Sequence, residues 1–307
     1  MFFSWMAGLL LLLNPIDVAD FLQIEYNGEI IAYMDRAGYT IPFDDIPLVD
    51  DAKLYLFAQQ LEAQVYQPPV NASFNDKGEI VPETKGRTLN HNAFIQQFFS
   101  YYYSNGPMRI NQIYQDVYPK VDRELLKYVS QKRIGQYVTF FNPNNKNRSH
   151  NISLAAKAIN NYVVMPGEIF SFNKVVGMRT KAKGYLQAPV IVKGELSEGI
   201  GGGICQVSST LYNAVDHAGL HIVKRYSHSR HVPYVPPGRD ATVSWYGPDF
   251  VFQNKYPYPV LIRARSQSGR MAVTIHSFPE IEHEPRHVPS VRNQLPEETP
   301  IGKNSIE

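Results

Sequence analysis

The 307-residue chain contains one cysteine, Cys205, which follows Ile204 and the three glycines Gly201 to Gly203. After Cys205, apolar residues recur at the spacing of one helix face, at Val207, Leu211, Ala214, Val215 and Ala218. Gly219 stands where a glycine commonly ends a helix. The pattern predicts a helix that carries Cys205 in its first turn.

The first turn of a helix is a suitable place for a nucleophilic thiol. Free backbone N–H groups and the positive end of the helix dipole favour the thiolate over the thiol. The same N–H groups can bind an oxyanion. Gly202 and Gly203 let the backbone turn sharply and let a substrate approach closely. Cys205 is therefore a candidate nucleophile for acyl transfer.

A thiolate nucleophile needs a base or a counter-cation, and histidine commonly supplies it. His217 and His221 fall near the far end of the predicted helix, roughly three turns or more from Cys205. The leading candidates are His228 and His231, which share the stretch RYSHSRHVPYVPPGRDATV. Asp240, later in that stretch, could orient either ring as the third member of a triad.

A lone cysteine is also commonly a buried and inert side chain, and this alternative reads Cys205 as part of the core. The conjunction of glycines, cysteine and helix start favours the nucleophile. One cysteine excludes an intramolecular disulfide and a structural zinc site built from a cysteine cluster. The sequence has no nucleotide-binding or metalloprotease motif. We therefore predict neither a metal nor an organic cofactor.

The charge and the N-terminus indicate where the protein acts. The net charge is +2, and no basic run interleaved with aromatic residues predicts a nucleic-acid partner. Residues 2–13 form an apolar run of the length found in signal peptides, although no Lys or Arg precedes it. We expect residues 1–22 to be a signal peptide or membrane anchor, the only membrane contact. The rest of the chain is expected to be extracytoplasmic, in the cell wall or at the membrane.

The chain length is that of one large or two modest domains. We predict an α+β fold, with a small α+β domain at residues 23–132 and a β-rich domain at residues 133–279 packed around the cysteine helix. Residues 280–307 are rich in Pro, Glu and polar residues, which predicts a mostly disordered tail.

Local patterns predict the elements of both domains. Asn27-Gly28 between apolar runs predicts a hairpin. Helices are expected over residues 50–66, with Asp50 or Asp51 as the cap, and over residues 90–103 and 153–162. Strands are expected at 71–74, 79–81, 185–192 and 271–276, and several more within 234–264, and a turn that leads into a strand is expected at 166–173. The polar residues 142–151 are expected to form a surface loop.

Several ordered motifs in residues 148–264 resemble those of the VanW family. These motifs are Phe-Ser-Phe-Asn at 170–173, Gly-Gly-Gly-Ile-Cys-Gln-Val-Ser at 201–208, Arg-Tyr-Ser-His-Ser at 225–229, and Pro-Pro-Gly-Arg-Asp-Ala-Thr-Val at 236–243. Residues 68–103 resemble the peptidoglycan-binding domain that often precedes this module. The resemblance implies a cell-wall protein whose partners are peptidoglycan stem peptides.

Some members of the family look like L,D-transpeptidases that act through the motif cysteine. The resemblance then implies that Cys205 is the nucleophile, that His228 is the general base, and that Asp240 orients His228. Substrate contacts would come from Gly202, Gly203, Ser208, Arg225, His231, Tyr234 and Arg239. The alternative is a peptidoglycan-binding module without turnover, linked to glycopeptide resistance or wall regulation.

Overall fold

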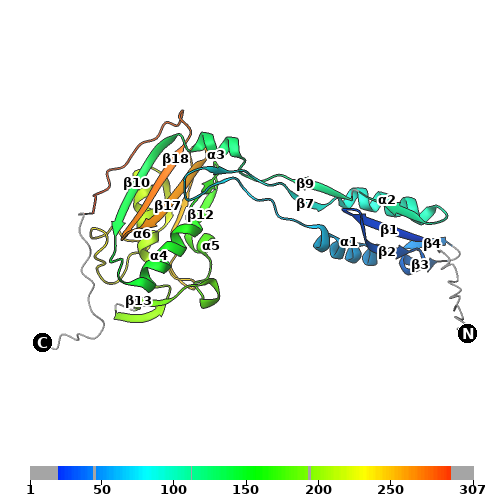
Figure 1. Ribbon diagram of the computed structural model, residues 1–307, viewed down its shortest axis with the longest axis horizontal. Helices are drawn as coiled ribbons and strands as arrows, with labels where there is room; N and C mark the ends of the chain where they lie inside the picture. Colours follow the sequence, from blue (N-terminus) through cyan, green and yellow to red (C-terminus); the bar gives the residue numbers. More distant parts are fainter. Residues whose placement is uncertain (1–19, 44–45, 112, 193–194, 292–307) are drawn as a thin grey trace, which may run out of the picture. The chain divides into compact units, whose positions relative to one another are not determined.

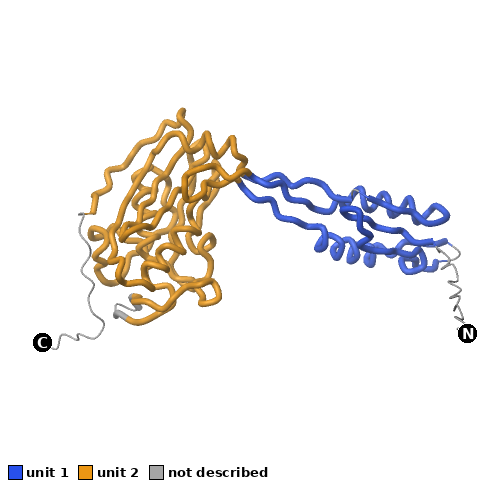
Figure 2. Tube along the Cα trace, viewed as in Figure 1, with its two compact units in different colours: residues 1–71, 83–120 blue, residues 72–82, 121–307 orange. Residues whose placement is uncertain are grey.

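The computed structural model of the protein describes residues 20–43, 46–111, 113–192 and 195–291. These residues fold into two compact units, each with a hydrophobic core of its own (Figure 2). Unit 1 comprises described residues up to Asn71 together with Glu83–Lys120. Unit 2 comprises Ala72–Pro82 and the described residues from Val121 onward. The predicted α+β class is confirmed, because helices and strands occur in both units.

Unit 1 is built on a three-stranded sheet in the order β2-β1-β8. Strand β1 (Phe21–Tyr26) pairs antiparallel with β2 (Glu29–Asp35) and parallel with β8 (Met108–Ile110). The turn between β1 and β2 places Asn27 and Gly28 at φ 53° and 86°. Asparagine and glycine tolerate this left-handed conformation, so the predicted hairpin is confirmed.

Two amphipathic helices complete the core of unit 1. Helix α1 spans Asp51–Val65 and α2 spans His91–Tyr103, as predicted. The side chains of Asp50 and Asn90 cap their first turns. Their apolar faces, which include the fully buried Phe94 and Phe98, form one cluster with the inner face of the sheet. The short elements are η1 (Ala37–Tyr39), β3 (Thr40–Phe43), β4 (Ile46–Val49), β7 (Gly86–Leu89) and β9 (Tyr114–Val117).

The centre of unit 2 is a four-stranded antiparallel sheet in the order β10-β18-β17-β11 (Figure 1). Its strands are β10 (Lys132–Phe140), β18 (Arg270–Ser277), β17 (Val260–Gln267) and β11 (Tyr162–Val164). Strand β18 confirms the strand expected at 271–276. Buried residues alternate along it, which gives the sheet one apolar face for the helices.

Helix α6 (Ile204–His217) packs against β10 and β18, and α4 (Lys146–Ile159) packs against β17 and α6. Close approach of α6 to the sheet depends on Gly135 of β10, because a Cβ there would collide with the carbonyl oxygen of Ala214. Helix α6 is buried along nearly its whole length. It ends before Gly219 at φ 76°, so the predicted cysteine helix is confirmed.

Smaller elements surround this core. A three-stranded sheet has the order β12-β16-β15, and β13-β14 and β5-β6 are two-stranded. Their bounds are β12 (Ile169–Ser171), β16 (Val251–Gln253), β15 (His221–Lys224), β13 (Gln187–Val192), β14 (Glu195–Ile200), β5 (Ser73–Phe74) and β6 (Ile80–Val81). The remaining helices are α3 (Arg123–Val129), α5 (Phe172–Val176) and η2 (Lys181–Lys183).

Three local predictions differ from the structure. Helix α4 begins at Lys146 rather than near Ser153, because the side chain of Asn145 accepts the Arg148 N–H and caps an earlier turn. The loop prediction for 142–151 was therefore wrong beyond Asn145. Among the strands expected within 234–264, only β16 and β17 form. Residues 234–250 are held instead by turns and side-chain contacts.

The division of the chain also differs from the predicted boundaries. The second unit begins at Val121 rather than at residue 133, and it takes β5 and β6 from the earlier part of the chain. Residues 280–291 of the expected tail lie against unit 2, where Ile281 is buried and Arg286 bonds to Asp216 at 2.8 Å. The expected leader lies mostly outside the described residues, as does 292–307.

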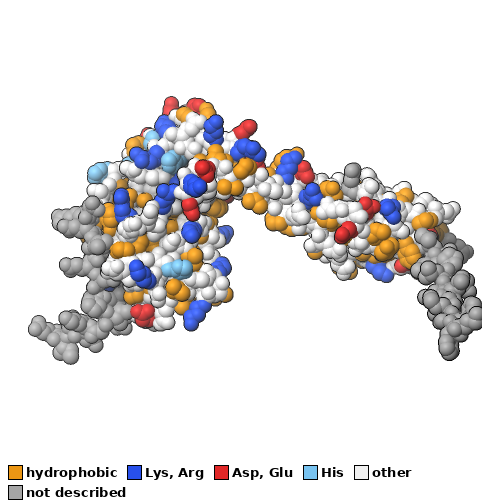
Figure 3. Space-filling view, viewed as in Figure 1, with side chains coloured by type: hydrophobic (Ala, Val, Ile, Leu, Met, Phe, Trp, Pro, Cys, Tyr) orange, Lys and Arg blue, Asp and Glu red, His pale blue; other side chains and the backbone are white. Residues whose placement is uncertain are grey.

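The charged side chains on the visible surface do not gather into a patch of one sign. On the face shown in Figure 3, Lys and Arg side chains are scattered among acidic, polar and apolar ones in each unit. Within the described ranges, no helix is both long enough and apolar enough to cross a membrane.

Candidate active site

Cys205 is the second residue of α6, and the glycines before it shape the start of that helix. Gly203 is the N-cap at φ 102°, and Gly201 lies at φ 89°. Both angles fall in the left-handed region, which glycine adopts without steric cost. The chain thus leaves β14 and enters α6 within three residues. This sharp entry sets Cys205 at the positive end of the helix dipole.

Gly202 is required for a different reason, which is packing. A Cβ there would lie 2.5 Å from the carbonyl oxygen of Pro189 and 2.6 Å from the carbonyl carbon of Ala188. The Gly202 carbonyl accepts from Asn151 Nδ2 at 3.1 Å, and Asn151 also bonds to both backbone groups of Leu186. Helix α4 and strand β13 therefore hold the glycine turn in place.

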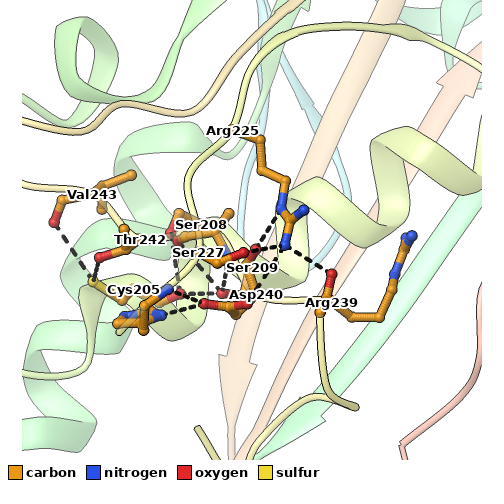
Figure 4. A network of polar contacts seen from close by, with 12 residues as sticks. Cys205, Ser208, Ser209, Arg225, Ser227, Arg239, Asp240, Thr242 and Val243 are labelled. Carbon is orange, nitrogen blue, oxygen red and sulfur yellow. Dashed lines mark hydrogen bonds and ion pairs between the residues drawn. The ribbon is translucent and has the colours of Figure 1, made fainter. Parts of the chain in front are cut away.

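The Cys205 thiol is only partly buried and has two direct polar neighbours from residues 242–243 (Figure 4). Its Sγ lies 3.8 Å from Thr242 Oγ1 and 3.6 Å from the Val243 carbonyl oxygen. These contacts orient the side chain at the start of α6. They come from a segment almost forty positions later in the sequence, which local patterns do not reveal.

His228 and Asp240 form a tightly bonded pair beside the thiol. His228 Nδ1 lies 2.5 Å from Asp240 Oδ2, and the same oxygen accepts the His228 backbone N–H at 2.6 Å. The exposed fractions of the two side chains are only 6% and 9%. Burial raises the pKa of the Asp240 carboxyl, but its bonds to His228 outweigh that effect and hold the pKa below its ordinary value.

Cys205 and His228 lie close enough for each to shift the pKa of the other. Burial raises the pKa of the Cys205 thiol, but His228, Val243 and Thr242 together bring the pKa below its ordinary value. Burial lowers the pKa of His228, but Cys205 and then Asp240 bring it above its ordinary value. Both shifts favour a thiolate–imidazolium pair, which is the reactive form of a cysteine nucleophile.

Arg225 bonds to Asp240 and to the loop around it rather than to the Cys205 thiol. Its Nε donates to the Asp240 carbonyl at 2.7 Å, and Nη2 lies 3.5 Å from Asp240 Oδ1. Nη2 also donates to Ser227 Oγ at 2.7 Å and to the Gly238 carbonyl at 2.8 Å. The guanidinium thus ties together both ends of the loop that carries His228 and Asp240.

Tyr234 and Ser208 lie near the thiol but are engaged by the protein. Tyr234 is buried, and burial followed by the charge of Cys205 raises its pKa well above the ordinary value. Ser208 is fully buried, and its Oγ donates to the Ala241 carbonyl at 2.5 Å. Neighbouring Ser209 accepts the Ala241 N–H at 2.9 Å. These hydroxyls fasten residues 240–242 to α6.

The other two predicted substrate residues are not brought to the thiol. Arg239 donates to Asn213 Oδ1 and to Asp216 Oδ2, both at 2.7 Å, and its side chain points away from Cys205 in Figure 4. It therefore binds the C-terminal half of α6. His231 is exposed, and it is not among the described groups that shift the pKa of Cys205. Of the two candidate histidines, the structure brings His228 to the cysteine.

Three neighbours of the thiol were missed in the sequence. Thr242 and Val243 belong to a quoted motif, but nothing in their types indicates a contact with sulfur. Arg179, after α5, lies close enough for its charge to interact with Cys205. Within residues 173–180, NKVVGMRT, nothing in the sequence distinguishes Arg179 from Lys174 as a neighbour of the thiol.

In this arrangement Cys205 can supply a thiolate, His228 can carry a proton, and the Asp240 carboxylate fixes the His228 ring. Backbone N–H groups of the first turn of α6 lie at the same point. Within the described residues, no group of three or more His, Cys, Asp or Glu side chains is placed to hold a metal ion.

Comparison with known proteins gives two relatives and one family. The family described as "VanW like protein" matches residues 147–276. Uncharacterized protein YoaR of Bacillus subtilis (strain 168) is 55% identical over 292 residues, which cover 95% of this chain and 96% of that protein. Vancomycin B-type resistance protein VanW of Enterococcus faecalis (strain ATCC 700802 / V583) is 36% identical over 83 residues, 27% of this chain and 30% of that protein. No solved structure matches the chain.

Proposed function

This chain belongs to the VanW family, and we propose that it is a cell-wall enzyme that acts on peptidoglycan stem peptides through a Cys205 acyl-enzyme. The reaction is L,D-transpeptidation, which forms 3→3 crosslinks. The observation that carries the proposal is the arrangement of three groups, in which Asp240 bonds to His228 and His228 in turn lowers the pKa of Cys205. The family relationship, including a relative named for vancomycin resistance, supports the cell wall as the place of action.

In the first half of the reaction, the Cys205 thiolate attacks the carbonyl carbon of the third stem residue, a diamino acid joined to D-Ala. The carbonyl oxygen takes the negative charge of the tetrahedral intermediate. When that intermediate collapses, the bond to D-Ala breaks, and the imidazolium of His228 gives its proton to the leaving amine. A thioester on Cys205 and free D-Ala are the products of this half.

In the second half, the side-chain amine of another stem attacks the thioester carbonyl. Neutral His228 accepts a proton from that amine, the carbon–sulfur bond breaks, and the thiolate returns. The new amide joins two diamino acids. If water replaces the amine, the same acyl-enzyme yields a shortened stem and a free carboxylate, which is carboxypeptidase activity.

Each neighbouring group has a role in this scheme. Asp240 fixes the ring of His228 through Nδ1 and so presents the other nitrogen, Nε2, to the thiol. The first backbone N–H groups of α6, near Gly203 and Cys205, stabilise the oxyanion. Arg225 holds the Asp240 backbone in position. No step requires a metal or an organic cofactor.

Stem peptides are found outside the cytoplasm, so the proposal places the protein at the cell wall, delivered or anchored by its first residues. Unit 1 then acts as a peptidoglycan-binding domain that keeps the enzyme at its polymer. Both statements rest on the resemblance and on the location of the substrate.

The test is to incubate the purified chain with tetrapeptide-stem muropeptides and to separate the products by liquid chromatography and mass spectrometry. We expect released D-Ala and a 3→3 linked dimer from the wild type, and neither from Cys205→Ser. If both proteins bind the stem equally and neither changes it, the chain is a binding module without turnover and the proposal is wrong.

A further inference from the structure

Arg179 lies beside the candidate site in a rigid setting. Its Nη2 donates to Asn173 Oδ1 at 2.7 Å, and its Cζ lies 5.7 Å from the ring centroid of Phe172. Asn173 is itself held, because its Nδ2 donates to the carbonyls of Ser244 at 2.9 Å and Pro248 at 3.1 Å. The guanidinium therefore has a fixed position and is not a mobile surface side chain.

One end of that guanidinium is buried without a partner. Among the described residues, no group accepts a hydrogen bond from Arg179 Nη1, although solvent does not reach this atom. Buried charged donors are nearly always hydrogen-bonded, and leaving one without an acceptor is costly. A donor left in this condition needs an explanation, and a bound ion that completes its hydrogen bonds is one.

Arg179, which carries the unpartnered donor, lies in the same part of unit 2 as Cys205. The Cβ position of Gly201 is 3.2 Å from Arg179 Cβ, so the arginine packs on the glycine turn that leads into α6. The charge of Arg179 also interacts with Cys205. Burial lowers the pKa of Arg179, while Cys205, Tyr185 and Asp249 raise it. Burial prevails, and the pKa of Arg179 stays below its ordinary value.

We propose that Arg179 binds the terminal carboxylate of the donor stem peptide, on the leaving side of the bond that Cys205 attacks. This inference rests on the proposed function, since it assigns the donor of that reaction. It makes Arg179 a substrate-binding residue that selects a donor with a free C-terminal carboxylate directly after the attacked carbonyl.

The chemistry of the guanidinium favours this ligand. A planar guanidinium matches a carboxylate better than any other common anion of a peptide. The leaving residue is a single amino acid, so its carboxylate lies about one residue length, roughly 3.5 Å, beyond the attacked carbonyl. The thiolate does not need Arg179 as its own partner, because His228, Thr242 and Val243 already contact Cys205.

The experiment compares two synthetic tetrapeptide stems that differ only at the C-terminus, one with a free D-Ala carboxylate and one with a D-Ala amide. Binding to Cys205→Ala is measured by calorimetry, and acylation of the protein with Cys205 intact is measured by mass spectrometry. Each measurement is repeated with Arg179→Gln, with Arg179→Lys and with Arg270→Gln, a control at an exposed arginine of β18.

We expect the carboxylate stem to bind Cys205→Ala at least about tenfold more tightly than the amide, the range of a charge-assisted hydrogen bond. Arg179→Gln should abolish this ratio, Arg179→Lys should restore part of it, and Arg270→Gln should leave it unchanged. If Arg179→Gln keeps the preference for the carboxylate stem over the amide stem, the inference is wrong. Arg179 would then have a structural role or stabilise the oxyanion. If the ratio depends on Arg179 but the wild type forms no acyl-enzyme, the carboxylate site stands and the proposed catalysis fails.

Discussion

Asp240 binds His228 twice through one carboxylate oxygen, at 2.5 Å to the ring Nδ1 and at 2.6 Å to the backbone N–H. Because both bonds end on Oδ2, the ring and the backbone of the histidine are fixed together. Since Nδ1 is engaged by Asp240, the ring keeps Nε2 for the thiol of Cys205.

The reactivity of Cys205 should extend to lower pH than that of an ordinary thiol, whose pKa is about 8.5. The pKa of Cys205 is lowered mainly by His228 against the opposing effect of burial. As pH falls from 9, iodoacetamide alkylation should therefore persist through neutral pH. His228→Gln removes the largest of the effects that lower the Cys205 pKa and leaves the burial, so its profile should move to higher pH, with alkylation at pH 7 slower by about tenfold or more. His231→Gln, an exposed control, should keep the wild-type profile. Identical profiles for His228→Gln and wild type would refute the pairing.

Asp240→Asn should slow acylation by about a hundredfold or more, because an amide cannot hold the imidazolium as the carboxylate does. Binding of the stem peptide should change little, so the loss should appear in kcat rather than in KM. Stopped-flow mixing with a thioester-forming stem measures both. A loss confined to KM would mean that Asp240 contacts substrate and does not act through His228.

Gly202→Ala should be strongly destabilising, since its Cβ would lie 2.5–2.6 Å from backbone atoms of Ala188 and Pro189. We expect a loss of at least about 2 kcal/mol in the free energy of unfolding. Gly238→Ala is the matched control, because Gly238 has φ 73° but no atom within 4 Å of its Cβ position. It should cost only the left-handed strain, about 1 kcal/mol. Urea unfolding followed by near-ultraviolet circular dichroism gives both values, and equal losses would show that packing is not the reason for Gly202.

Asp216 should stabilise unit 2 through Arg239 and Arg286, whose Nη atoms lie 2.7 and 2.8 Å from its oxygens. Burial raises its pKa, but the two arginines bring the pKa below the ordinary value. A lowered folded-state pKa means that this stability is complete above the unfolded pKa of about 3.9 and is lost as pH falls through the folded one.

We therefore expect Asp216→Asn to cost about 1–3 kcal/mol at pH 7 and progressively less in acid. Urea titrations at pH 7 and pH 3, with amide hydrogen exchange across α6 as the local readout, measure the difference. Glu198→Gln, at an exposed position of β14, should have little effect at either pH. An undiminished cost at pH 3 would contradict the ion-pair explanation.

Those parts of the fold that depend on local signals could be predicted. Asn27-Gly28 gave the first hairpin, Asp50 and Asn90 gave two helix starts, and the spacing after Cys205 gave α6. The start of α4 was missed because a run of polar residues resembles a loop. In the structure Asn145 caps the helix, and Asn151 is buried and bonds to the carbonyls of Leu186 and Gly202.

The candidate site was predictable only in part. His228 and Asp240 share one loop, so their pairing was a reasonable expectation from twelve-residue spacing in a single motif. The contact of Thr242 and Val243 with Cys205, and the approach of Arg179, are made by tertiary packing across different elements. For Arg239, residue type indicated a substrate contact, whereas the fold pairs it with Asn213 and Asp216 on α6.

The most direct test of the account is intact-mass spectrometry of the protein mixed with a tetrapeptide stem, beside Cys205→Ser. We predict a mass increase equal to the tetrapeptide stem minus one molecule of free D-Ala, present on the wild type, lost on treatment with hydroxylamine as a thioester is, and absent from the variant. Unmodified wild-type protein under conditions in which the stem is shown to bind would contradict a Cys205 acyl-enzyme.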